Sequence, residues 1–236
     1  MTRLGQMTDQ ADISSPNAQD TSSATDKRLK VVLTGFGAFP GAPFNPSQTL
    51  ALAVHRQCQA RLQRAGIELE VVILPVVFSA IPSHLAAIKA KSQPDFVLHL
   101  GLAARRKQIT IETRARNRLS LLHCDAEGRR ALAPQIEAEG PTIRPVSLSY
   151  LALKSAMSGK GVRIALSHDA GDYICNQTLF LSLGLFEKAG FVHLPKPRAM
   201  DRKRAPSSRQ ASPLTAMIPA LERALLCLSR PCCVKI

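Results

Sequence analysis

Val31-Val32-Leu33-Thr34-Gly35 is a β-branched run that ends in glycine, a pattern typical of a strand buried on both faces. Similar short apolar runs follow at 69–74, 96–100, 162–166 and 191–194, and residues 108–115 alternate like a strand beside them. Helical patterns separate the runs, at 47–64 with Ser47 as the cap, 79–91, 150–158 and 172–188, and an amphipathic helix at 214–228 closes the chain. Strands that alternate with helices predict an α/β fold, a three-layer α/β/α sandwich around a mainly parallel twisted sheet.

Composition narrows the classes of function. The 236 residues are 45% hydrophobic, which is enough for a core and excludes a wholly disordered chain. No run approaches the roughly 18 uninterrupted apolar residues of a membrane span. Lys and Arg outnumber Asp and Glu by 31 to 17, but with 8 Phe, 2 Tyr and no Trp the chain lacks rows of base-stacking aromatics. Nucleic acid is therefore not the expected partner, and the basic clusters at 105–130 and 196–209 are interpreted as solvated loops.

The chain is predicted to form one folded unit, residues 29–236, after a disordered polar leader at 1–28. The leader carries no apolar segment of a secretory signal, so a cytoplasmic location is the default expectation. Residues 116–148 are predicted to be irregular, and 196–213 to be a flexible loop. The six cysteines contain no C-x-x-C pair, so no metal site is expected.

In an open parallel sheet the ligand site lies beyond the carboxyl ends of the strands. That places the turn after Thr34, the segment after Leu100, the loop at 167–172 and His193 in one neighbourhood. This convergence predicts where a functional site would form.

The first of these turns is rich in phenylalanine and glycine. Phe36, Phe39 and Phe44 predict an apolar slot for a small flat ligand, or else rings that pack the edge of the sheet. The glycines do not form a dinucleotide-binding motif, because Pro40 takes the place of the third glycine.

Cys175, His193 and Glu112 are the candidate catalytic residues. Cys175 lies in the first turn of a predicted helix, where the helix dipole and unpaired N–H groups lower the pKa of a thiol; the alternative is a buried cysteine that packs as a small hydrophobe. His193 ends the next strand, which returns it to the start of that helix. Glu112 is placed to orient the imidazole as the third member of a triad; the alternative is an exposed glutamate paired with Arg114.

Taken in order along the chain, these motifs resemble the pyroglutamyl peptidase I (pyrrolidone-carboxylate peptidase) family. The similar blocks cover about residues 30–197: Val32-Leu-Thr-Gly-Phe-Gly-Ala-Phe, Asn45-Pro-Ser, Leu74-Pro-Val, Gly101-Leu-Ala, Ile111-Glu, Ala115-Arg-Asn, Ser167-His-Asp-Ala-Gly-Asp-Tyr-Ile-Cys-Asn and Gly190-Phe-Val-His-Leu-Pro. The resemblance implies a cysteine peptidase that removes N-terminal pyroglutamate from peptides, works without metal or cofactor, and forms a homodimer or homotetramer.

Carried over motif by motif, the resemblance makes Cys175 the nucleophile, His193 the general base and then acid, and Glu112 the group that orients His193. The substrate-binding positions that it implies are Phe36, Phe39, Phe44, Asn45, Leu102 and Ile174.

Three segments depart from the residues that are usual in this family. They are 102–106, where the family has Gly-Gln-Ala-Gly-Gly-Arg from residue 101, 118–124, where it has an Asp-rich stretch, and 196–198. The departures spare the triad and bear on substrate affinity and subunit packing. The alternative function is a catalytically silent or altered α/β protein that binds small amides, nucleosides or RNA, and a single hyper-reactive thiol would separate the two.

Overall fold

The computed structural model describes Met1 and residues 28–159, 162–196 and 213–230. Its strands are β1 (Leu29–Phe36), β2 (Ile67–Leu74), β3 (Phe96–Leu102), β4 (Ile109–Glu112), β5 (Arg114–Arg116), β6 (Ile143–Pro145), β7 (Ile164–Ser167) and β8 (Ala189–Leu194). Its helices are α1 (Pro46–Arg64), α2 (Ile81–Ser92), α3 (Tyr150–Met157), α4 (Ile174–Leu185) and α6 (Pro213–Leu228).

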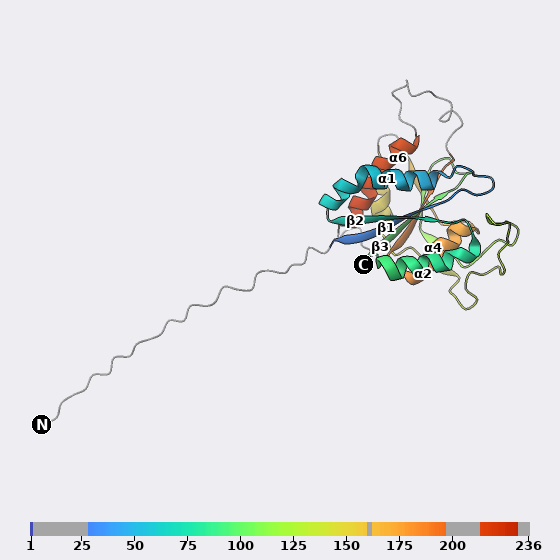
Figure 1. The fold of residues 1–236 in the computed structure, drawn as a ribbon, viewed down its shortest axis with the longest axis horizontal. Helices are drawn as coiled ribbons and strands as arrows, with labels where there is room; N and C mark the ends of the chain where they lie inside the picture. The colour runs from blue at the N-terminus through green and yellow to red at the C-terminus, as the bar shows by residue number, and fades with distance from the viewer. Residues whose placement is uncertain (2–27, 160–161, 197–212, 231–236) are drawn as a thin grey trace, which may run out of the picture.

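The strands form one central sheet with helices on both faces, which confirms the predicted α/β sandwich (Figure 1). Its strand order is β2-β1-β3-β8-β4-β7, and every neighbouring pair is parallel except β4 and β8. Helices α1, α3 and α6 pack together, while α2 packs against α4 on the opposite side of the sheet. The carboxyl ends of β1, β3 and β8 therefore meet at one edge, as the sequence predicts.

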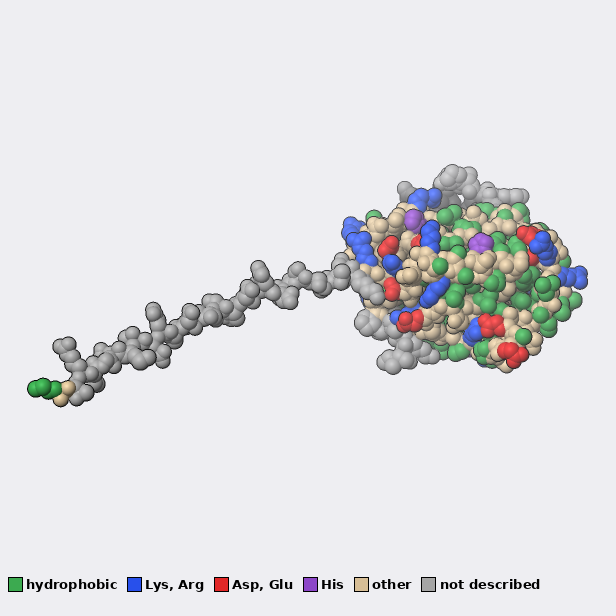
Figure 2. Space-filling model, turned by 60° about the horizontal axis from the view of Figure 1, so that its bottom comes forward, with side chains coloured by type: hydrophobic (Ala, Val, Ile, Leu, Met, Phe, Trp, Pro, Cys, Tyr) green, Lys and Arg blue, Asp and Glu red, His purple; other side chains and the backbone are tan. Residues whose placement is uncertain are grey.

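On the face that Figure 2 shows, Lys and Arg side chains are dispersed among acidic and apolar ones instead of gathering into one patch. Among the described helices, none is long and apolar enough to cross a membrane.

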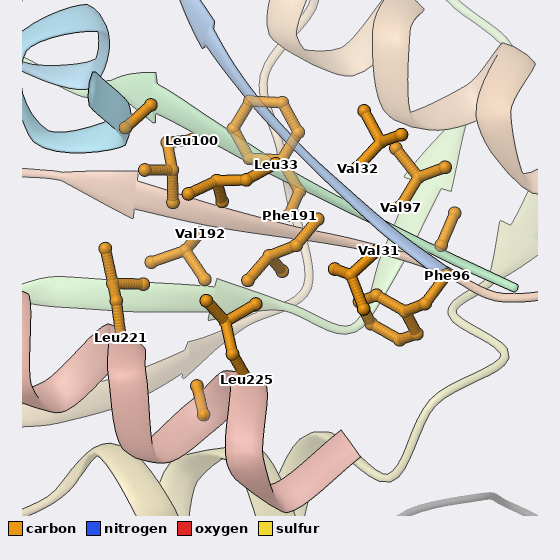
Figure 3. Packing of buried hydrophobic residues seen from close by; sticks show 14 of the residues in the cluster. Val31, Val32, Leu33, Phe96, Val97, Leu100, Phe191, Val192, Leu221 and Leu225 are labelled. Carbon is orange, nitrogen blue, oxygen red and sulfur yellow. The ribbon is translucent and has the colours of Figure 1, made fainter. Parts of the chain in front are cut away.

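The core lies along the central strands, whose side chains are covered on both faces. Val31, Val97 and Val192 are 1% exposed or less, which explains why these strands appear in the sequence as continuous apolar runs. Leu221 and Leu225 of α6 point at one face of the sheet and close this part of the core (Figure 3).

Two sequence predictions fail around the site-bearing edge. Residues 108–115 do not form one strand: the chain leaves the central sheet after Glu112, and β5 pairs antiparallel with β6, inside the segment predicted to be irregular. The helix predicted at 172–188 is shorter, Ile174–Leu185. The predicted leader and the predicted loop at 196–213 fall almost wholly outside the described residues, so both stay predictions.

A buried histidine ties the central strands to α4. Hydrogen bonds join His99 Nδ1 to Thr34 Oγ1 and His99 Nε2 to Ser182 Oγ, both at 2.8 Å. Burial lowers the pKa of His99 to about 3, so the ring is neutral in the folded protein at any ordinary pH.

This histidine makes folding sensitive to acid. Because the unfolded imidazole titrates near 6.5, the unfolded chain binds one proton more than the folded chain between about pH 6.5 and pH 3. The free energy of unfolding should therefore fall as pH drops through that window, by up to about 1.4 kcal/mol per pH unit from this group. We expect His99→Gln, whose amide can still bond both hydroxyls, to show a shallower decline. Unfolding in denaturant at several pH values measures it, and equal slopes in both proteins would contradict it.

Candidate active site

The sheet brings His193 beside the start of α4. His193 lies near the end of β8, where it is paired with Gly101 of β3 on one side and Thr110 of β4 on the other. Cys175 is the second residue of α4, and a Cβ placed on Gly101 would lie 3.0 Å from Cys175 Sγ. The sulfur therefore lies over Gly101, whose neighbour across the β3–β8 pair is His193.

Glu112 and His193 form a buried hydrogen-bonded pair. Glu112 Oε1 lies 2.7 Å from His193 Nδ1, and the two residues are 0% and 3% exposed. With Nδ1–H donated to the carboxylate, Nε2 is the ring nitrogen that can accept a proton. The alternative of an exposed glutamate paired with Arg114 is wrong, because Arg114 Nε instead donates to the backbone oxygen of His168.

Arg106, which was not among the predicted site residues, completes this cluster. Its Nη1 donates to Glu112 Oε1 at 2.5 Å and to Thr110 Oγ1, and its Nη2 donates to Ser167 Oγ and to the Asp169 carbonyl oxygen. The position of Arg106 in the sequence could have indicated this role, since it precedes Glu112 by six positions in a loop at the site-bearing edge. The role was missed because Arg106 lies in a basic cluster that was interpreted as solvated.

The protonation states follow from burial and from these charges. Burial, and after it the charge of the Glu112 carboxylate, raise the pKa of the Cys175 thiol to about 12, although Arg106 and a backbone N–H act in the opposite direction. The expected lowering by the helix N-terminus is therefore wrong for the resting protein, because desolvation outweighs the N–H groups. Burial also lowers the pKa of His193. At neutral pH the resting pair is a thiol beside a neutral imidazole.

Asn176 fixes the start of the helix that carries Cys175. It is fully buried; its Oδ1 accepts from the backbone N–H of Arg116, and its Nδ2 donates to the carbonyl oxygens of Arg116 and Arg118. The Tyr173 hydroxyl donates to the Cys124 carbonyl oxygen at 2.7 Å. Part of the predicted solvated cluster is thus built into the wall of the site.

The helix that follows the turn after β1 is capped by Asn45, not by Ser47 as predicted. Asn45 is the N-cap of α1: its Oδ1 accepts from the backbone N–H of Ser47, and its Nδ2 donates to the Gly37 carbonyl oxygen. Ser47 Oγ instead accepts from the backbone N–H of Phe36. Both amide atoms of Asn45 are therefore occupied in shaping the turn.

The other predicted substrate-binding residues differ in exposure. Phe36 is 2% exposed and its ring packs against Phe191, Phe39 is half-buried, and Phe44 is 47% exposed. Ile174, beside Cys175, is 1% exposed, and Leu102 is half-buried at the end of β3. Contact of all of these with a substrate stays a prediction.

Comparison with known proteins decides the family. The sequence profile of the family described as pyroglutamyl peptidase matches residues 29–225. The chain belongs to the pyroglutamyl peptidase family. It is similar to the pyrrolidone-carboxylate peptidase of Thermococcus onnurineus, with 32% identity over 184 residues, 75% of this chain and 89% of the relative. That of Oceanobacillus iheyensis is 30% identical over 177 residues, 70% of this chain and 83% of the relative.

Solved structures agree. The crystal structure of the pyrrolidone carboxyl peptidase from Thermus thermophilus matches with a TM-score of 0.70 and 32% identity, over 83% of this chain and 98% of that one. The pyroglutamyl peptidase I structure from Bacillus amyloliquefaciens, at 24% identity, supports the fold with a TM-score of 0.73 over 86% of this chain and 97% of that one.

Two of the three departures from the usual family residues can be placed in the site, while residues 197 and 198 of the third lie outside the described residues. Leu102, at the position of the usual glutamine, presents an apolar side chain at the end of β3. The segment 118–124 is tied to the loop before Cys175, since the backbone N–H of Ser120 donates to the Asp172 carbonyl oxygen. Among the described residues, no three His, Cys, Asp or Glu side chains are grouped to hold a metal ion.

Proposed function

We propose that this chain is a cysteine peptidase that removes an N-terminal pyroglutamyl residue from peptides. The observation that carries the proposal is the buried Glu112–His193 pair beside Cys175, in a chain that belongs to the pyroglutamyl peptidase family. The relatives are named as peptidases of pyrrolidone carboxylate, which is the same chemical group.

The protonation states support the following chemical roles for the three residues. His193 Nε2 removes the thiol proton while Cys175 Sγ attacks the carbonyl carbon of the pyroglutamyl amide. The carbon–nitrogen bond then breaks, His193 returns the proton to the leaving amine, and a thioester remains on the sulfur. Water, deprotonated by His193, hydrolyses the thioester, and the free acid and the thiol are released. Glu112 stabilises the imidazolium that forms in each half of the cycle.

Selectivity for the neutral lactam follows from the apolar residues beside the thiol. Ile174 precedes Cys175 in α4, and Phe36 ends β1 at the same edge of the sheet. We expect the substrate to bind against this apolar edge, where an N-terminal ammonium group would be desolvated without a partner. We expect kcat/KM for a pyroglutamyl amide to exceed that for the alanyl, glutaminyl and prolyl amides by at least about 10²-fold.

Release of a fluorophore from the four amides measures this preference. The prolyl amide is the matched control, because it keeps the five-membered ring but replaces the lactam by a charged amine. Comparable turnover of prolyl and pyroglutamyl amides would contradict the proposed selectivity, and no turnover of any amide would favour the silent α/β protein.

Assembly into a homodimer or homotetramer remains part of the proposal. The family relationship supports it, and light scattering of the purified chain tests it.

A further inference from the structure

Arg106 and His193 donate to the same carboxylate oxygen. Glu112 Oε1 accepts from Arg106 Nη1 at 2.5 Å and from His193 Nδ1 at 2.7 Å, while Oε2 is buried without a hydrogen-bond partner. The Arg106 side chain is 24% exposed and that of Glu112 is 0% exposed. The ion pair is therefore shielded from solvent on the glutamate side, where screening by water is weak.

A fully buried carboxylate needs a counter-ion. Two groups can supply it: Arg106, which is charged at every relevant pH, or His193, which supplies a charge only when protonated. With Arg106 in place, the charge of Glu112 is already neutralised, and the proton affinity of His193 is therefore lower. Without Arg106, the carboxylate would draw a proton onto the imidazole, and a protonated His193 cannot accept the proton of Cys175.

The other ionisable groups around this cluster do not replace Arg106. The Asp169 carboxylate on the adjoining loop pairs with Arg118, and buried His99 of β3 is neutral. Among the described residues, no other Lys or Arg bonds Glu112. The titratable or charged groups carried by the elements that adjoin the cluster are, by element, Glu112 (β4), Arg114 (β5), Cys175 (α4), His193 (β8), and Arg105, Lys107, His168 and Asp169 (adjoining loops), of which Arg105 and Lys107 are exposed.

The second half of the guanidinium has a mechanical role. Arg106 Nη2 donates to Ser167 Oγ at 3.1 Å and to the Asp169 carbonyl oxygen at 2.8 Å, which ties Glu112 to the loop that leads into Cys175. A purely mechanical clamp would change rates or stability when removed, but it would not change the proton affinity of His193. The two roles can therefore be separated by titration.

We infer that Arg106 is a positioning residue of the triad, the permanent counter-ion of Glu112 that keeps His193 in the neutral form able to accept the thiol proton. The inference rests on the proposed function for its catalytic meaning, but the electrostatic coupling exists whether or not the chain cleaves peptides. The charge of Arg106 lowers the pKa of His193 and of Cys175, in agreement with this role.

An NMR titration tests the coupling without any substrate. The imidazole C–H signal of His193, assigned by comparison with His193→Gln, is followed against pH in Cys175→Ser and in Cys175→Ser/Arg106→Gln. We expect the His193 pKa to rise by roughly one unit or more when Arg106 is removed. An unchanged or lower pKa overturns the inference, and leaves the proposed peptidase activity untouched.

Activity gives the second readout, with a matched control. In Arg106→Gln the acidic limb of the pH profile of kcat/KM should move to higher pH. The size of this movement should equal the rise in the His193 pKa that NMR measures. Arg118→Gln is the control, because Arg118 bonds the same loop through Asp169 and does not contact Glu112, so its limb should stay in place.

Arg106→Lys keeps the charge and loses the fork of the guanidinium. The acidic limb of its pH profile of kcat/KM should stay at the wild-type pH even if kcat falls. If Arg106→Gln does not fold, Arg106→Lys is used as the test variant by itself. A limb that moves in Arg106→Lys, or that moves equally in Arg118→Gln, overturns the inference.

Discussion

Replacing Cys175 with serine is expected to lower kcat/KM for a pyroglutamyl amide by about 10⁴-fold or more. The resting thiol already has its pKa raised to about 12, and a serine hydroxyl in the same half-buried place is far harder to deprotonate. His193 is a weak base there, because burial lowers its pKa, so it cannot compensate. Steady-state release of the fluorophore measures the loss, and unfolding curves of the variant show whether the fold is intact.

Cys124 supplies the matched control. It is an exposed free thiol near the site, and only its backbone oxygen is used, as the acceptor from the Tyr173 hydroxyl. Cys124→Ser keeps that oxygen and should stay within about twofold of wild-type activity. If Cys124→Ser were inactive while Cys175→Ser kept its activity, Cys175 would not be the nucleophile.

Alkylation of Cys175 should abolish activity, whereas alkylation of Cys124 should not. The protonation state of Cys175 limits how fast it is alkylated. Since Cys175 rests as a thiol, iodoacetamide should react with it only as fast as His193 assists, instead of at the rate of a free thiolate. The position of Cys175 in the helix predicted a hyper-reactive thiol, but we now expect a thiol that reacts only with the assistance of a base.

The fold could be predicted from sequence because its strands are buried on both faces. In the central strands β1, β3 and β8 the side chains on both faces are buried, as at Leu33, Leu98 and Val192, so each of these strands appears in the sequence as a mostly apolar run. The β5–β6 hairpin could not be found in this way. Its strands have three residues each and include Arg114, Arg116 and Arg144, and in β5 only Ala115 is buried.

Two members of the site, Cys175 and His193, could be predicted because the order of helices and strands along the chain fixes their positions. Cys175 and His193 are joined by one helix and one strand, which necessarily returns the histidine to the start of the helix. The partner of Glu112 was not predictable, because a side-chain ion pair depends on the path of the loop after β3, and neighbouring Arg105 and Lys107 offer the same charge. Nor could the sequence give the pKa of Cys175, since the desolvation that dominates it exists only in the folded protein.

Glu112→Gln is expected to lower kcat by roughly 10³-fold while KM changes little. Although burial raises the pKa of Glu112, the hydrogen bond from His193 and the charge that His193 carries when protonated lower it, as do a hydrogen bond from Ser167 and the charge of Arg106. The net effect holds the pKa below its usual range, so the residue is a carboxylate at neutral pH. Glutamine keeps the shape but not the charge that stabilises the imidazolium. An amide oxygen in the place of Oε1 can still accept from His193 and Arg106, but the NH₂ then occupies the place of Oε2, which has no partner.

The pH profile of Glu112→Gln distinguishes a lost charge from a damaged site. With the carboxylate removed, Arg106 is left as an uncompensated cation near His193, so the His193 pKa should fall and the acidic limb of kcat/KM should move to lower pH. That shift is opposite in sign to the one expected for Arg106→Gln. In the double variant Glu112→Gln/Arg106→Gln the shifts should largely cancel, while kcat stays as low as in Glu112→Gln because no charge remains to stabilise the imidazolium. A Glu112→Gln enzyme with wild-type kcat, or one whose limb moves to higher pH, would show that the carboxylate does not act through His193.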